Sequence, residues 1–374
     1  MNEIVPAVYT ALKIFKDNGM EGYLVGGAVR SYLLGTEIKD YDITTNAPPV
    51  TTKRLFANYP LYTIGEKHGT VVVTIDGVKI DITTYRSDVE YIDHRHPKEV
   101  VFSDNLLEDL KRRDFTINAL CLNIDNKLID EFNGLEDLNN KIIRAIGDPN
   151  TRFYEDALRI LRALRFSSRL NFTIEEKTKE AMFKNKHLLE YISNERKKEE
   201  LLYILATKNR YQTINEYLSI FNTFIPFKET DKKIDDFSNE YYALSYLLSS
   251  CEKVNLKELK FSRNEIFLIE ALIEATNTDL KNDYNFISLL SDPLAKDILT
   301  YLEELYDIDY HKRYKLLSEY IITIDDLTIS GNDLINMGYS GKHIGEIKKE
   351  LLEKIHRKEL RNDHSSLLKY LETK

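Results

Sequence analysis

In the first part of the chain, up to about residue 145, the spacing of hydrophobic residues changes several times between that of a helix and that of a strand. Residues 6–18 carry apolar side chains at helical spacing, and short β-rich and helical runs then alternate. The predicted strands are residues 23–25, 41–44, 70–75 and 78–84, and the further predicted helices are residues 28–34 and 48–57. Asp76-Gly77 joins two of the strands, and a two-residue Asp-Gly connection is a strong β-hairpin signal. The pattern predicts an α+β fold with a mixed or antiparallel sheet.

Two further segments of this part have less regular patterns. Residues 86–104 are polar and have no period, so we expect a mobile loop there. Residues 116–124 (TINALCLNI) are expected to form a strand, with residues 127–130 as its hairpin partner.

The pattern becomes helical after Pro149 and stays helical to residue 374, with few glycines or strand-like runs. We therefore predict one α/β head followed by an all-helical region. The expected divisions are a head (1–148), a neck (149–215), a body (216–322) and a tail (323–374).

Composition and charge narrow the class of protein. No apolar run reaches membrane-spanning length, and the N-terminus lacks the apolar core of a signal peptide. Cys121 and Cys251 lie in apolar surroundings, which predicts buried thiols and a reducing compartment, the cytoplasm. His94-x-His96 comes nearest to a zinc spacing, and a polar loop is the better interpretation. The net charge of −9 disfavours a histone-like binder, but nucleic acid stays open because binding depends on where lysines and arginines cluster.

Asp40 and Asp42 are two residues apart, so that on a strand both side chains point the same way. Two carboxylates on one face repel each other and are typical of a site with cations between them. Oxygen ligands favour magnesium or manganese over zinc, and two such ions serve phosphoryl or nucleotidyl transfer. Asp81 is the candidate third carboxylate, although taken alone it is typical of an exposed strand position.

Gly26-Gly27 leads from a strand into a helix, where backbone N–H groups can approach a triphosphate. A Gly-Gly pair alone is weak evidence, because any tight turn uses one, and the surrounding sequence is not a P-loop. Arg30, one helical turn later, can reach the same phosphates.

LVGGAVRSYLLG followed by DYD resembles the motif of polymerase-beta superfamily nucleotidyltransferases, in particular the class II tRNA nucleotidyltransferase and bacterial poly(A) polymerase family. Four further motifs follow in the order of that family: KRRDFTINAL, IIRAIGDP, RFYEDALRILRALRF and ERKKEELLYIL. Residues 329–355 are similar to the tail of Gram-positive CCA-adding enzymes. Ser31 and Lys198 stand where the family usually has Asp and Arg.

The resemblance implies a polymerase-beta-like head that holds two magnesium ions on Asp40 and Asp42, with Asp81 as a further catalytic carboxylate. It also implies that Arg113 and Asp114 contact the sugar and phosphates of the nucleotide. A salt bridge between these two neighbours is equally compatible with the sequence.

The resemblance places Glu155, Asp156 and Arg159 at the EDxxR motif, which pairs with the incoming base. At about 100° per residue these side chains and Arg162 fall on one side of a predicted helix, opposite its apolar residues. An Asp acceptor beside an Arg donor matches C and A and rejects U and G, whose pattern is reversed. A solvated helix with internal ion pairs is the plain alternative.

The resemblance further implies addition of C, C and A to the 3′ end of tRNA from CTP and ATP, with release of pyrophosphate. Residues 61–73 resemble the CCA-adding version, and residues 86–102 form a loop that CC-adding enzymes shorten. An A-adding enzyme, a poly(A) polymerase and an inactive RNA-binding protein are the alternatives. A homodimer is left open. Candidate tRNA contacts on the tail are Lys342, Lys348, Lys349, Lys354 and Arg357, although a solvated helix face fits them equally well.

Overall fold

The structure, a computed structural model, describes residues 4–63, 65–91, 97–251 and 254–373. Backbone contacts divide the chain into two compact units, unit 1 (Met1–Ile225) and unit 2 (Pro226–Lys374). The finer division into head, neck, body and tail stays a prediction. His94 and His96 lie outside the described residues.

Unit 1 contains a seven-stranded mixed sheet with the strand order β3-β4-β5-β2-β1-β8-β9. β2 and β5 are parallel, and the other neighbours are antiparallel. The predicted α+β class is confirmed. The strands are β1 (Gly22–Val25), β2 (Tyr41–Thr45), β3 (Leu61–Tyr62), β4 (Thr70–Ile75), β5 (Val78–Thr84), β8 (Cys121–Leu122) and β9 (Leu128–Ile129).

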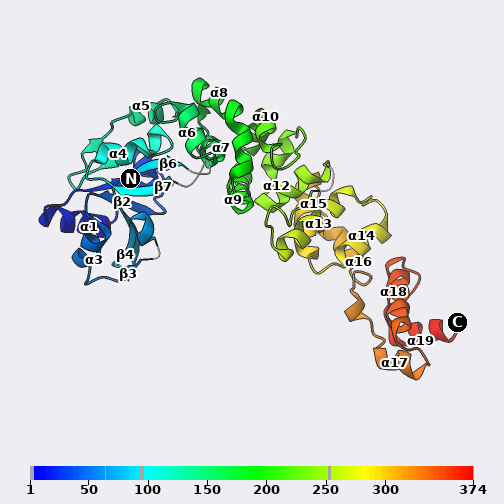
Figure 1. Ribbon diagram of the computed structural model, residues 1–374. Coiled ribbons are helices and arrows are strands. Elements are labelled where there is room, and N and C mark those ends of the chain that lie inside the picture. The colour runs from blue at the N-terminus through cyan, green and yellow to red at the C-terminus, as the bar shows by residue number, and fades with distance from the viewer. Residues whose placement is uncertain (1–3, 64, 92–96, 252–253, 374) are drawn as a thin grey trace. The chain divides into compact units, whose positions relative to one another are not determined.

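Alternating side chains of β4 and β5 build the core of the sheet, as the period of two requires. Asp76 and Gly77 both adopt positive φ between these strands, which confirms the predicted hairpin. Two helices in the predicted places, α1 (Pro6–Asp17) and α3 (Pro49–Leu55), pack against this part of the sheet. Figure 1 shows α1 and α3 beside the strands β2 and β4. A third helix, α2 (Gly27–Leu33), follows β1 directly and leads the chain away from the Gly-Gly turn.

The predicted loop at 86–104 is wrong for its described residues. β6 (Arg86–Tyr91) and β7 (Pro97–Phe102) form a separate antiparallel pair, with Arg86 opposite Phe102. Residues 86–91 (RSDVEY) are mostly polar and show no strict alternation of apolar and polar side chains, so a period of two is not visible there. The sequence pattern therefore could not indicate it.

The predicted strand at 116–124 is only partly correct. Thr116–Asn118 form a 3₁₀ turn, η2, and the strand is limited to Cys121–Leu122. Polar contacts explain the turn, because Asp114 accepts hydrogen bonds from the Phe115 N–H and the Asn118 amide. The predicted hairpin partner is confirmed as β9.

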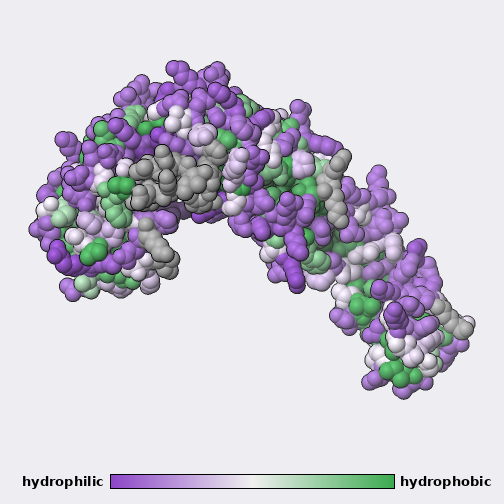
Figure 2. Space-filling view, in the orientation of Figure 1, coloured by the Kyte–Doolittle hydropathy of each residue, from purple (hydrophilic) through white to green (hydrophobic). Residues whose placement is uncertain are grey.

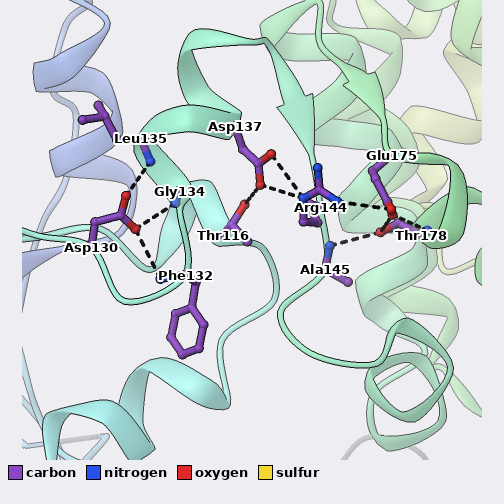
Figure 3. A network of polar contacts seen from close by, with 10 residues as sticks. All are labelled: Thr116, Asp130, Phe132, Gly134, Leu135, Asp137, Arg144, Ala145, Glu175 and Thr178. Carbon is purple, nitrogen blue, oxygen red and sulfur yellow. Dashed lines mark hydrogen bonds and ion pairs between the residues drawn. The ribbon is translucent and has the colours of Figure 1, made fainter.

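A polar network joins this turn to the helices that follow (Figure 3). Asp137 accepts hydrogen bonds from the Thr116 hydroxyl at 2.7 Å and from Arg144. Arg144 also pairs with Glu175 at 3.2 Å, and Glu175 caps the helix that begins beside it. Gly134 packs directly against the backbone of this turn. A Cβ at this position would lie 2.3 Å from the Thr116 carbonyl oxygen, so a larger residue would clash. The network lies around α5 (Gly134–Asn139) and the parallel pair β10 (Ile142–Ile143) and β11 (Thr173–Ile174), and α4 (Leu106–Lys111) precedes the turn in the chain.

The rest of unit 1 is helical, as the period predicts. Its helices are α6 (Pro149–Glu155), α7 (Leu158–Leu170), α8 (Glu176–Asn185), η3 (Lys186–Tyr191), α9 (Asn194–Leu205), α10 (Arg210–Glu216) and α11 (Leu218–Phe221). α7 packs against α9 and α10 through a buried apolar side that includes Ile160 and Leu164. The predicted continuous helix through 155–162 is wrong, because Asp156 ends α6 with extended backbone angles and α7 begins at Leu158.

Unit 2 is helical throughout its described residues. Its elements are η4 (Lys232–Asp236), α12 (Glu240–Ser249), α13 (Arg263–Asn277), α14 (Asp283–Leu290), α15 (Ala295–Tyr306), α16 (His311–Leu317), η5 (Ile324–Asp326), α17 (Gly331–Asn336), α18 (Lys342–His356) and α19 (His364–Glu372). Leu334, Leu351 and Leu367 belong to an apolar core that joins its last three helices.

Hydrophilic residues cover most of the visible surface of each unit (Figure 2). Among the described helices, none combines the length and the apolar character that a membrane crossing requires. Cys121 is a buried free thiol as predicted, whereas Cys251 is only half-buried, because it lies just beyond the end of α12.

Candidate active site

A cleft of about 920 Å³ in unit 1 gathers most of the residues singled out from the sequence. Ten of those twelve residues line it: Gly26, Gly27, Arg30, Asp40, Asp42, Arg113, Asp114, Asp156, Arg159 and Arg162. They come from the β1–α2 turn, the start of β2, the segment after α4, and the α6–α7 junction. The two others, Asp81 and Glu155, lie outside the lining.

The carboxylates meet on two neighbouring parallel strands. Asp42 of β2 is in register with Asp81 of β5, and paired positions of adjacent strands present their side chains on one face. Asp40 lies just before β2 and is exposed, as is Asp81, whereas Asp42 is half-buried. In the described part of the chain, three metal-ligand atoms come within 4.8 Å of one another only at Glu303, Asp309 and His311 of unit 2. The three aspartates therefore lie near one another, but their carboxylate oxygens are not all within 4.8 Å of each other.

Burial, and to a smaller degree the neighbouring carboxylates, raise the pKa values of two of these carboxyls. Burial raises the pKa of Asp42 to about 6; Asp81 and Asp40 also raise it, and Arg113 opposes the rise. The pKa of Asp81 is raised by burial and then by the charge of Asp40. A divalent cation on these oxygens would offset both effects, so the donor set fits magnesium.

The Gly-Gly turn brings backbone close to these carboxylates. Gly26 has φ of +72°, a conformation that side chains rarely adopt. A Cβ there would lie 3.9 Å from an Asp42 carboxylate oxygen and 3.7 Å from Arg113 Nη1. Glycine therefore leaves the cleft open where a phosphate would approach. Arg30 is buried one turn later, and its Nη1 donates to the Asn118 amide oxygen.

Arg113 and Asp114 do not pair with each other. Arg113 donates to Asp109, a fully buried carboxylate that also binds Arg112. Asp114 instead accepts hydrogen bonds from Arg162, at 2.8 Å and 2.6 Å. Burial alone would raise the pKa of Asp114, but Arg162 and hydrogen bonds lower it to about 2. The predicted alternative of a salt bridge between neighbours is therefore wrong, and each residue is held by a different helix.

The α6–α7 junction presents Asp156 and Arg159 to the cleft. Asp156 Oδ1 accepts from the Leu158 N–H at 3.1 Å, which orients the carboxylate at the start of α7. Arg159 is buried and donates to the Arg112 carbonyl at 2.8 Å and to Glu155 at 3.1 Å. Glu155 thus orients Arg159 from outside the lining. Its predicted contact with the nucleotide stays a prediction, and only the continuous helix through Asp156 is wrong.

Sequence reasoning missed one side of the cleft. Arg165, Phe166 and Arg169 of α7 line it, together with Tyr203 of α9. The signal is present, since Arg162, Arg165 and Arg169 follow the i, i+3, i+7 spacing of one helix face. The predicted charged face ends at Arg162 and is therefore about two turns too short.

Carboxylates that suit divalent cations, next to guanidinium groups that suit phosphates, provide the chemistry of nucleotidyl transfer. Together with the mixed sheet, they define the class of protein as a nucleotidyltransferase.

Comparisons with known proteins agree. A family described as the poly(A) polymerase head domain matches residues 22–144, and one described as a probable RNA- and SrmB-binding site of polymerase A matches residues 171–226. A CCA-adding enzyme of Bacillus pumilus is 38% identical over 94% of each chain.

The crystal structure of the Bacillus stearothermophilus CCA-adding enzyme in complex with CTP superimposes with a TM-score of 0.81, at 26% identity, over 99% of each chain. The Thermotoga maritima CCA-adding enzyme complexed with tRNA has a TM-score of 0.68 at 24% identity, over 99% of this chain and 96% of that one, and shows the shared fold. The chain therefore belongs to the family of CCA-adding enzymes, which are tRNA nucleotidyltransferases.

Proposed function

We propose that this chain adds C, C and A in turn to the 3′ end of tRNA, using CTP and ATP and no nucleic-acid template. The observation that carries the proposal is one cleft that unites the paired-strand carboxylates with the Asp156–Arg159 edge. In each round the RNA 3′-hydroxyl attacks the α-phosphorus of the nucleotide, and pyrophosphate leaves. Family membership supports this reaction over an A-adding enzyme or a poly(A) polymerase.

Two magnesium ions are proposed as cofactors, held by Asp40 and Asp42 with Asp81 beside them. When bound, they would neutralise phosphate charge and favour the ionised form of the attacking hydroxyl. Family membership supports a metal requirement of this kind. The Gly26-Gly27 turn and Arg30 would hold the triphosphate on the same side of the sheet.

Base choice is assigned to Asp156 and Arg159. Asp156 would accept a hydrogen bond from the exocyclic amine of C or A, and Arg159 would donate to the adjacent ring nitrogen. U and G present a carbonyl and a ring N–H at these positions and are rejected. Arg113 and the Asp114–Arg162 pair would then face the sugar and phosphates.

The test uses three tRNAs that end before CCA, after C, and after CC, with labelled CTP and ATP supplied singly and together. The proposal expects C on the first two tRNAs, which are completed only when both nucleotides are present, and A on the third, which ATP alone completes. Addition of A alone would identify an A-adding enzyme, and a long A tail a poly(A) polymerase. Binding without any addition would identify an inactive RNA-binding protein.

Contacts to the body of tRNA are proposed for α18 in unit 2. Lys342 and Lys349 are exposed there, with Lys348 half-buried between them. Lys354 and Arg357 are less available than predicted, because they pair with Glu359 and Glu353. Charge removal at Lys342 and Lys349 should lower the salt dependence of tRNA binding by roughly one per lost phosphate contact. Cytoplasmic location stays a prediction, and the choice between monomer and homodimer can be read by light scattering.

A further inference from the structure

One side of the cleft has no role in the reaction as proposed above. It is formed by Arg165 and Arg169 of α7 and by Tyr203 of α9. Resting on the proposed function, we propose that these three residues form the subsite for the 3′-terminal nucleotide of the RNA. Arg165 and Arg169 take its phosphate, and Tyr203 packs against its base.

Positive charge is in excess on this side. The guanidinium groups of Arg30, Arg162 and Arg165 lie 4.9 to 5.4 Å from the centre of the Phe166 ring. Arg169 faces the same cleft and, in the described part of the chain, has no carboxylate partner. Among the described residues, the ion pairs of these four guanidinium groups are Asp114 with Arg162 and Glu200 with Arg165, and Asp156 adds one more negative charge near Arg162. Such an unbalanced group of cations suits an anionic ligand.

The position of Arg165 is fixed before any ligand binds. Its Nη1 donates to the buried carboxylate of Glu200 at 3.1 Å. Its guanidinium lies between two rings, 4.9 Å from Phe166 and 5.3 Å from Tyr203. A group held in this way loses little freedom on binding a phosphate, which favours affinity. Glu200 is therefore a positioning residue for Arg165.

Tyr203 offers the aromatic surface of the subsite. Its side chain is 50% exposed although it lies in the wall of a cleft, and the guanidinium of Arg165 adds charge at one side of the ring. A base that stacks on such a ring is bound without regard to its identity. This tolerance matches the RNA end, whose terminal base changes after each round of addition.

The incoming nucleotide needs the opposite property, and its proposed site lies elsewhere. Selective hydrogen bonding to a base belongs to Asp156 and Arg159. Arg169 is ten residues beyond Arg159, which corresponds to about 15 Å along the α7 axis. The two ends of this helix therefore suit two different ligands. One is the base of the incoming nucleotide, which must be selected, and the other is the terminal base of the RNA, which is bound whatever its identity.

The test compares Tyr203→Leu, Tyr203→Phe and Arg169→Gln with the parent, with Arg54→Gln as the matched control. Arg54 is an exposed arginine of α3 outside the cleft. Two quantities are measured for each: the Kd of labelled CTP by equilibrium dialysis, and the half-saturating concentration of tRNA lacking CCA in single-turnover C addition, the latter at several salt concentrations to give its salt slope. Thermal unfolding of each variant checks the fold.

Tyr203→Leu should raise the half-saturating tRNA concentration by roughly tenfold, the loss of one stacked base, while the CTP Kd changes less than about twofold. Tyr203→Phe should behave as the parent. Arg169→Gln should lower the salt slope of tRNA binding by about one, and Arg54→Gln should not.

A loss of CTP affinity with unchanged tRNA dependence would overturn the proposal and give these residues to the triphosphate. Equal defects in Tyr203→Phe and Tyr203→Leu would show that the hydroxyl acts rather than the ring. Unchanged behaviour of all variants would also overturn it. If the parent adds no nucleotide, the proposed function fails, and the subsite is then judged by the Kd of tRNA ending in CC, which the same variants should raise.

Discussion

Unit 1 and unit 2 place their charges differently. Unit 1 buries Arg30, Asp109, Asp114, Arg159 and Glu200, and each has a partner of opposite charge or a hydrogen bond. In unit 2, the described residues include no buried Asp, Glu, Lys or Arg, and the only buried polar side chains are Ser245 and His356.

The difference sets unit 1, which holds the cleft, apart from unit 2, whose described Asp, Glu, Lys and Arg side chains are not buried. A buried charge is costly unless it is paired, so a concentration of paired buried charges needs a reason beyond stability. In unit 1 that reason is the cleft. In unit 2 the ion pairs are at the surface, such as Arg357 with Glu353, and contribute little.

The largest effect is expected from the carboxylates of the cleft. Asp42→Ala should lower nucleotide addition by roughly three decades or more, because a metal ligand is lost, while tRNA binding survives. The measurement is single-turnover addition in magnesium with a parallel binding assay. Asp76→Asn is the matched control, because Asn tolerates the positive φ of that exposed turn. Near-parental turnover of Asp42→Ala would show the metal assignment to be wrong.

A deletion within residues 86–102 tests whether a separate part of unit 1 is needed for the addition of A but not of C. Deletion of residues 89–98 should reduce ATP incorporation by roughly tenfold or more and leave CTP incorporation nearly intact, as expected if this segment, which CC-adding enzymes shorten, serves the addition of A selectively. The fold should survive, because this pair is not part of the seven-stranded sheet. An equal loss of both activities in a folded variant would contradict a selective role in A addition.

Lowering the pH should reduce the folding stability of unit 1, because Asp114 becomes protonated. Its pKa of about 2 in the folded state lies below its ordinary value, so its contribution is present above about pH 4 and is lost as the pH falls through 2. The difference corresponds to about 2 kcal/mol at pH 7. Urea unfolding should therefore show the gap between the parent and Asp114→Asn narrowing by about 1 kcal/mol from pH 7 to pH 3. A constant gap would mean that Arg162 does not hold this carboxylate ionised.

The smallest effect is expected in unit 2. Asp283 pairs with Arg313 and Lys358 at the surface, and its side chain is 40% exposed. Asp283→Asn should change the free energy of unfolding by no more than about 1 kcal/mol, and added salt should remove most of the difference. A larger loss of unfolding free energy that salt does not change would contradict the claim that the ion pairs of unit 2 contribute little to stability.

Much of the fold could be predicted from the sequence, and the successes have a common cause. The strands at 70–75 and 78–84 each bury one face, so their period of two and the Asp-Gly turn are both visible. The β6–β7 pair shows no strict alternation of apolar and polar residues, so the sequence pattern does not indicate its strands. The strand predicted at 116–124 is mostly a turn, because contacts to Asp137 and Asp114 decide its shape, and these partners are distant or ambiguous in sequence.

The candidate site was recovered through motifs more than through geometry. Motifs alone assign Asp42, Asp156 and Arg159 to one site, and the cleft unites them. They could not show that Glu155 accepts a hydrogen bond from Arg159, or that the helix breaks at Asp156, because local hydrogen bonding decides both. The side formed by Arg165 and Tyr203 depends on how two helices pack, which a single-helix period does not reveal.

Base selection by protein side chains at the α6–α7 junction is the core of the proposed mechanism. Asp156→Asn tests it best, because the Asn carbonyl can keep the hydrogen bond from the Leu158 N–H, while its amide presents a donor to the base. Asp156→Ala removes both groups and serves as the comparison. The measurement is single-nucleotide addition to tRNA lacking CCA, with CTP, ATP, UTP and GTP offered separately.

We predict that the ratio of CTP to UTP incorporation falls by roughly one to two decades in Asp156→Ala, since a good bidentate pair is worth about 1–3 kcal/mol of discrimination. In Asp156→Asn it should fall further, with UTP gaining in absolute terms, because a donor then faces the uracil carbonyl. If both variants still refuse UTP and GTP as firmly as the parent, this junction does not read the base, and Asp156 and Arg159 are only a hydrogen-bonded helix start.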